Sequence, residues 1–144
     1  MAASNDFGAS LAGECWKIAE VLWGDFKHTD FGKIILPFTL LRRLECVLEP
    51  TRAAVIEAHV AHKDSGIDID LILRQVTRYP FYNLSSYTLG SLGSTKTRQN
   101  LQDYVARFSD NARVIFEQFD FTNTLVRLDK AGLLFRLCKD FAAI

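Results

Sequence analysis

Histidines and cysteines are the residues of this 144-residue chain that come nearest to a metal or catalytic site. His59 and His62 lie three residues apart and Asp64 follows, so on a helix the two imidazoles would share a face and could offer a metal two nitrogens and a carboxylate. Two histidines and one carboxylate make an incomplete ligand set, and such side chains are most often simply solvated. We therefore predict an exposed helix face and no metal site.

The three cysteines, Cys15, Cys46 and Cys138, are odd in number, far apart and outside any CxxC spacing, which is typical of reduced thiols in a cytoplasmic protein. A histidine beside Cys46 or Cys138 could make it the nucleophile of a small hydrolase, and the sequence leaves that alternative open. Cysteines in apolar helical runs are usually inert packing residues. The prediction is that they belong to the core.

Other patterns could bind a nucleotide or a base. The glycine-spaced run Gly90–Ser94 lacks the preceding apolar strand of a phosphate-binding loop, so we interpret it as a loop that enters a helix. Trp16, Trp23 and the 11 phenylalanines could form a stacking platform, but large aromatic side chains usually dominate cores. We predict that they pack inside.

Seventeen basic and 17 acidic residues cancel, so any contact with DNA must be local. The pairs Arg42–Arg43 and Lys96/Arg98 could touch phosphates, and the alternative is a solvated helix face. Charge and expected exposure give six residues predicted to contact DNA or a protein partner: Lys27, His28, Arg42, Arg43, Lys96 and Arg98.

The elements that position these residues are predicted to be helices, giving an all-α, irregular multi-helix bundle with an ordered loop around residues 79–95. Residues 1–9 are predicted to be a flexible N-terminus and residues 10–144 a single helical domain. The first helix would be capped by Ser10 and stopped at Gly24. The helices are expected over residues 11–22, 31–48, 51–63, 68–78, from about 95 to 108, about 110–119, and 122–141 with a break at 129–132.

Several boundaries carry specific predictions. Asp30 should cap the long second helix, which Pro37 should kink or split, and Asp68 should cap the fourth. Ser94 or Thr95 should cap the helix after the loop, and Ser109 or Asp110 the next. On the long helix, the polar side is predicted to carry Arg42, Arg43, Glu45 and Glu49.

The segment LWGDFKHTDFGKIILPFTLLRRLECVLEPTR, Leu22 to Arg52, resembles the opening domain of the modification subunit, the adenine-N6 DNA methyltransferase, of type I restriction-modification systems. Family members have a helix with Trp, an LRG-D/N break and a D/EY-like start into an ILPLL-FLRRL helix. The counterparts here are Trp16, Leu22 to Asp25, Asp30-Phe31, and Ile35 to Leu44; Ala53 to Tyr79 match more loosely.

The resemblance implies a helical domain that lies beside a Rossmann-like methyltransferase domain, helps to enclose double-stranded DNA through weak, non-specific contacts, and assembles with specificity and restriction subunits. The family's S-adenosylmethionine-binding glycine motif and its NPPF/Y catalytic motif belong to the following domain. Neither motif occurs here, since the only prolines are Pro37, Pro50 and Pro80. We therefore expect no cofactor and no catalysis in this chain, and S-adenosylmethionine in the domain downstream.

The chain stops at Ile144 while still apolar, which indicates part of a longer methyltransferase. A stand-alone helical interaction or oligomerisation module is the alternative. No stretch approaches 18 apolar residues and the N-terminus lacks a signal peptide, so we expect a cytoplasmic protein without membrane contact.

Overall fold

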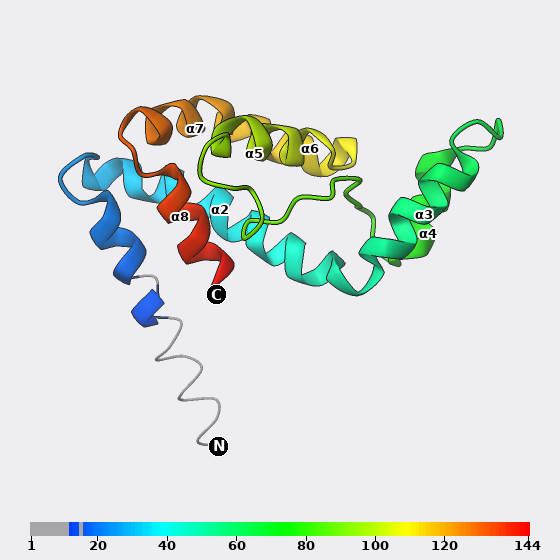
Figure 1. Ribbon diagram of the computed structural model, residues 1–144, viewed down its shortest axis with the longest axis horizontal. Coiled ribbons are helices and arrows are strands. Elements are labelled where there is room, and N and C mark those ends of the chain that lie inside the picture. Colours follow the sequence, from blue (N-terminus) through cyan, green and yellow to red (C-terminus); the bar gives the residue numbers. More distant parts are fainter. Residues whose placement is uncertain (1–11, 15) are drawn as a thin grey trace, which may run out of the picture.

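A computed structural model describes residues 12–14 and 16–144, and there the chain consists of helices joined by turns and one long loop (Figure 1). No strand occurs in these ranges, where the β-type pairing is limited to the isolated bridges Trp23–Phe26 and Asn83–Phe108. The predicted all-α class is confirmed. The predicted flexible segment 1–9, the Ser10 cap and Cys15 lie outside the described residues.

The long helix α2, His28–Leu48, forms the spine of the molecule and is about 30 Å long. It begins after Lys27, so the prediction that Asp30 is the N-cap is wrong. Asp30 instead lies in the first turn, where a carboxylate interacts favourably with the positive end of the helix dipole. The acidic residue therefore indicated the first turn of the helix but not the residue at which the helix begins.

Pro37 lies inside α2 without splitting it, so of the two predicted outcomes, a kink or a split, the split is wrong. Proline removes one backbone donor and crowds the preceding turn. Pro37 is buried on the same face as Ile34, Phe38 and Leu41, and burial of this face stabilises the continuous helix.

A helical hairpin follows α2 and stands away from the other helices (Figure 1). The 3-10 turn η1, Glu49–Thr51, has Pro50 in its first turn and redirects the chain into α3, Arg52–His62. Asp68 caps α4, Ile69–Thr77, as predicted, because its carboxylate accepts the Asp70 N–H at 3.1 Å. We call α3, α4 and their connecting turn the arm.

The remaining helices are α5, Thr97–Ala106, α6, Asp110–Gln118, α7, Phe121–Lys130, and α8, Leu134–Ala142. Of these, α7 and α8 pack against α2, and α5 and α6 pack against α7. The predicted break at 129–132 is confirmed by Gly132, whose φ of +74° ends α7. None of the described helices combines the length and apolar character needed to cross a membrane.

The caps after the loop were predicted less well. The N-cap of α5 is Lys96, not Ser94 or Thr95, and the Thr97 hydroxyl bonds back to the Gly93 carbonyl at 2.6 Å. Ser109 is the N-cap of α6 as predicted, but its side chain makes no capping bond. Its hydroxyl instead accepts the Tyr82 N–H at 3.2 Å and donates to the Asn111 side chain at 2.7 Å, so a tertiary contact replaces the capping bond.

Phenylalanine rings close the core where α2, α6, α7 and α8 meet. The Phe38 ring packs against Phe121 at 5.1 Å and Phe141 at 5.3 Å between centroids, and Phe116 packs against Phe121 at 5.4 Å. All four side chains are at most 2% exposed. The prediction that aromatic residues fill the core holds for these phenylalanines.

Candidate interaction surfaces

The loop of residues 79–95 is ordered because neighbouring helices bind its backbone. The Arg52 guanidinium, from α3, donates to the carbonyls of Ser85 at 3.2 Å and Tyr87 at 2.7 Å. The Asn83 side chain donates to the Tyr104 carbonyl of α5 at 2.9 Å. The predicted ordered loop is confirmed, and it links the arm to the rest of the fold.

Glu45 fixes the same loop from α2 and is 7% exposed, so its predicted place on the polar side of the helix is wrong. One carboxylate oxygen accepts from the Arg42 guanidinium at 2.7 Å. The other accepts from the Leu89 N–H at 2.9 Å and from the Tyr104 hydroxyl at 2.8 Å. Three donors, two of them buried, compensate for the desolvation of the charge.

The buried hydrogen-bond network around Glu45 has a structural role. Burial, together with the neighbouring Glu45 charge, raises the pKa of Tyr104, so its phenol stays protonated and donates. The adjoining cavity, lined by Glu45, Arg52 and Tyr104 among others, has a volume of about 20 Å³. Ligand pockets need several hundred Å³, so this one is too small for an organic substrate.

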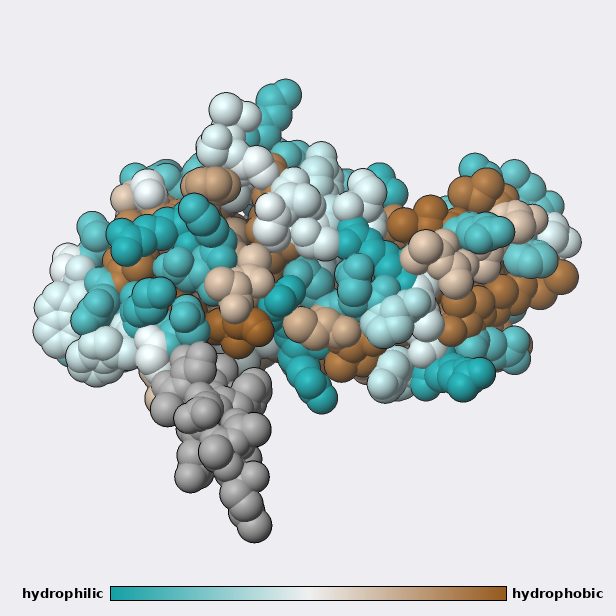
Figure 2. Space-filling model, turned by 60° about the horizontal axis from the view of Figure 1, so that its bottom comes forward, coloured by the Kyte–Doolittle hydropathy of each residue, from teal (hydrophilic) through white to brown (hydrophobic). Residues whose placement is uncertain are grey.

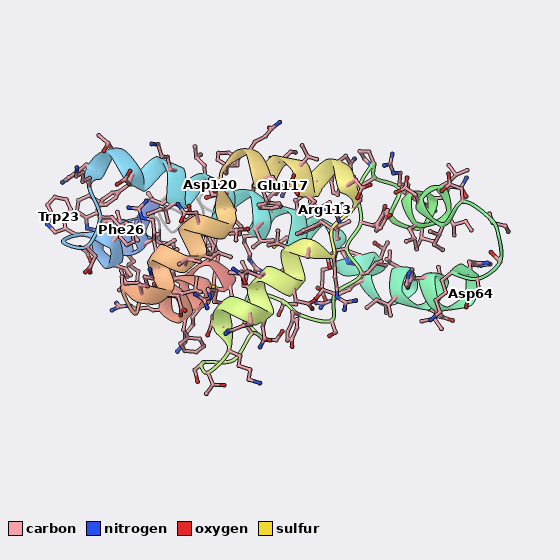
Figure 3. All side chains as sticks on the ribbon, turned by 90° about the horizontal axis from the view of Figure 1, so that it is seen from above. Trp23, Phe26, Asp64, Arg113, Glu117 and Asp120 are labelled. Atoms are coloured by element: carbon pink, nitrogen blue, oxygen red, sulfur yellow. The ribbon has the colours of Figure 1, made fainter. Side chains whose placement is uncertain are left out.

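An exposed aromatic tip lies at one end of the molecule, where Trp23 and Phe26 are labelled in Figure 3. Trp23 is 62% exposed and Trp16 is 66% exposed, so the prediction that the tryptophans are core residues is wrong. The chain turns at Gly24, whose φ is +96°, which leaves Trp23 outside the core at the end of the first helix. Its ring meets the His28 imidazole edge-on at 4.5 Å.

The turn behind Trp23 is held by α7. Arg127 of α7 lies over the Phe26 ring, 5.1 Å from its centroid, and its guanidinium is 3.5 Å from the Asp30 carboxylate. These contacts fix the backbone of the turn that carries the Trp23 side chain.

The arm exposes a second apolar surface at the opposite end of the molecule, where Figure 2 shows hydrophobic side chains along the projecting hairpin. Val60, Ile67 and Leu71 are 63%, 58% and 54% exposed. Val55 and Leu73 are buried between the two helices, so the hairpin has its own small core and these three side chains are left over. Exposed apolar side chains that gather on one part of a folded domain are typical of an interaction site.

The six predicted contact residues occupy separate places. Lys27 and His28 lie at the start of α2, and the exposed Arg43 lies 15 residues further on, about 22 Å along the axis. Arg42 is half-buried and bonds to Glu45. The structure does not gather the six residues into one site, and their contact with DNA stays a prediction.

The last two of the six lie elsewhere, at the N-terminal end of α5. Lys96 is exposed there, and the Arg98 guanidinium is 3.5 Å from Asp129 of α7.

The two described cysteines, Cys46 and Cys138, lie in different environments. Cys138 is buried, and burial raises the pKa of its thiol from 9.0 to about 12, so it remains an un-ionised packing residue. Cys46 is exposed, so the core prediction is right for Cys138 and wrong for Cys46, which lies on the outer face of α2. Among residues 12–14 and 16–144, no group of three side chains could hold a metal ion.

The fold and these surfaces define an all-α domain built on one long helix, with a buried carboxylate network and exposed apolar side chains at both ends. A family model described as the HsdM N-terminal domain matches residues 11–141, and the chain belongs to this family. It is an N-terminal domain of a modification subunit of a type I restriction-modification system. Searches of curated proteins and of solved structures returned no match.

Proposed function

We propose that this domain has a non-catalytic role, in which it contributes to subunit assembly and to the enclosure of DNA while the parent enzyme transfers a methyl group from S-adenosylmethionine to adenine N6. The observation that carries the proposal is the family match over residues 11–141. Its partners would be the downstream methyltransferase domain, the specificity and restriction subunits, and double-stranded DNA.

The exposed apolar side chains support the assembly role. Val60, Ile67 and Leu71 occur together on a hairpin that is anchored to the body through Arg52 and the loop. Interfaces that carry large binding energies bury apolar side chains at their centre, and an anchored surface loses little conformational entropy on binding. The arm is therefore the surface we assign to protein contact.

Methyl transfer is assigned to another domain because the residues here do not fit the cofactor. A glycine loop that binds such a nucleoside follows a β-strand, whereas Gly90 and Gly93 lead from an irregular loop into α5. Recognition of a flipped adenine by an Asn-Pro-Pro motif is likewise impossible with isolated prolines.

The test uses the complete modification subunit with its partner subunits. Val60→Asp combined with Leu71→Asp places two charges on the arm, and Val114→Asp combined with Ile115→Asp on the exposed face of α6 is the matched control. We expect the arm variant to lose assembled mass in light scattering and to methylate DNA poorly, while circular dichroism shows a folded domain. Full assembly, DNA affinity and methylation by the arm variant would refute the assembly role.

A further inference from the structure

Positive charge gathers where α5, α7 and α8 meet, although the chain as a whole is neutral. Two stretches of sequence lack any acidic residue. Residues 90–102 contain Lys96 and Arg98, and residues 130–139 contain Lys130, Arg136 and Lys139. Each stretch alone is an ordinary run of a few charges.

The fold brings the two stretches together. α5 packs against both α7 and α8, which lie side by side away from the arm in Figure 1. The Arg98 guanidinium reaches Asp129 at 3.5 Å, next to Lys130 in the last turn of α7. After the turn at Gly132, α8 buries Leu137 and Cys138 and leaves its opposite face exposed. We call Lys96, Arg98, Lys130, Arg136 and Lys139 the basic patch.

Most of the patch is not neutralised. Among the ion pairs of the described residues, the patch takes part in one, between Arg98 and Asp129. Lys96, Lys130, Arg136 and Lys139 are exposed and form none, and these residues make no side-chain hydrogen bond either. By contrast, Arg113 of α6 and Arg107, the C-cap of α5, are each paired with an acid one turn away. Four free cations on three helices make a local positive field.

Helix stability explains only part of this arrangement. Lys130 and Lys139 lie in last turns, where a cation stabilises the negative end of the helix dipole. Lys96 and Arg136 lie at the opposite ends, as the N-cap of α5 and in the first turn of α8, where a cation is unfavourable. Neither first turn contains an acid that would offset them. These two residues therefore favour a ligand that is itself anionic.

We propose that the basic patch is the surface through which this domain contacts the backbone phosphates of double-stranded DNA. The inference rests on the proposed function, in which the domain helps to enclose DNA, and it assigns the contact to α5, α7 and α8. It adds Lys130, Arg136 and Lys139 to Lys96 and Arg98, and it does not use the α2 residues Lys27, His28 and Arg43. Lysine and arginine contacts to phosphates carry no sequence information, in keeping with a specificity that lies in another subunit.

The experiment measures DNA affinity of the assembled methyltransferase by fluorescence anisotropy over a range of salt concentrations. The patch variant is Arg136→Gln with Lys139→Gln, and the control is Lys33→Gln with Arg107→Gln, two exposed cations outside both the patch and the arm. Each lost phosphate contact lowers the salt dependence by about 0.9 and the affinity roughly fivefold near 0.15 M salt. We expect about a 25-fold loss for the patch variant and none for the control.

The outcomes separate this inference from the function on which it rests. Equal affinities of patch and control variants, with a loss only in Lys27→Gln combined with Arg43→Gln, would overturn the patch and leave DNA enclosure standing. Unchanged affinity in all three double variants would overturn both. Loss of a subunit in light scattering, with normal DNA affinity of the remaining complex, would show a protein contact and overturn the patch. Thermal melting by circular dichroism verifies that each variant is folded.

Discussion

Replacement of Glu45 by alanine should destabilise the domain by about 4 kcal/mol. The carboxylate is 7% exposed, and its buried partners, the Leu89 N–H and the Tyr104 hydroxyl, belong to residues that are 2% and 4% exposed. A buried donor left without an acceptor costs about 1–3 kcal/mol, so two such donors account for about 4 kcal/mol. Arg42 adds little, because its side chain is 24% exposed and can turn to solvent.

Glu45→Gln keeps the shape and removes the charge. If its amide oxygen faces Leu89 and Tyr104, two charge-assisted hydrogen bonds become neutral ones, a loss of about 1 kcal/mol each. The glutamine variant should therefore lose about 2 kcal/mol, roughly half the loss of the alanine variant. Tyr104→Phe removes one donor, and a double-mutant cycle with Glu45→Gln should give a coupling energy of about 1 kcal/mol.

The assay is urea unfolding followed by circular dichroism, with hydrogen exchange of the Leu89 amide as the local measurement. Exchange at Leu89 should rise in Glu45→Ala while the amides of the α7 core stay protected, because Glu45 is the acceptor for that N–H. An alanine variant within about 1 kcal/mol of the original chain would refute the reasoning. So would a coupling energy of zero with Tyr104.

Three further predictions concern the thiols and the exposed tip. In a Cys15→Ser background, Cys46 should react with a thiol reagent in the folded chain and Cys138 only after unfolding; equal rates would contradict their placement. Because the pKa of Cys138 is raised from 9.0 to about 12, its contribution to stability is complete below pH 9 and is lost as the pH rises towards 12, by up to about 1.4 kcal/mol per pH unit. Urea unfolding of Cys138→Ala should show a shallower alkaline decline, and identical slopes would count against burial as the cause. In Trp16→Phe, acrylamide should quench Trp23 fluorescence almost as well as free indole, whereas strong protection would contradict its 62% exposure.

The helices could be predicted because their signals are local. Asp68 caps α4, Pro50 redirects the chain after α2, and Gly132 ends α7, each through interactions within a few residues. One error arises where a distant residue competes for the local group. The Ser109 hydroxyl accepts the Tyr82 N–H instead of an N–H of its own helix, and no local sequence pattern indicates this.

The buried network could not be predicted for the same reason. Leu89 and Tyr104 are 44 and 59 residues from Glu45 along the chain. Arg42, three residues before it, is the one local partner, and an Arg-Glu pair at that spacing is typical of a solvated helix face. The predicted position of Glu45 on the polar side of the helix therefore depended on its charge alone. Its burial results from the loop that folds back over α2.

The exposed tryptophans show what periodicity cannot distinguish. An apolar side chain at helical spacing indicates that some surface will cover it. The sequence does not distinguish whether that surface is the chain's own core or a protein partner. Here phenylalanines of at most 2% exposure close the core, while Trp16, Trp23 and Leu71 remain largely exposed. Covering a large apolar side chain is worth about 1.5–3 kcal/mol, so these residues represent free energy that folding of this domain leaves unused. In the assembly that we propose for this modification subunit, that free energy is available for binding other proteins, which is why we place the protein contacts at the apolar arm.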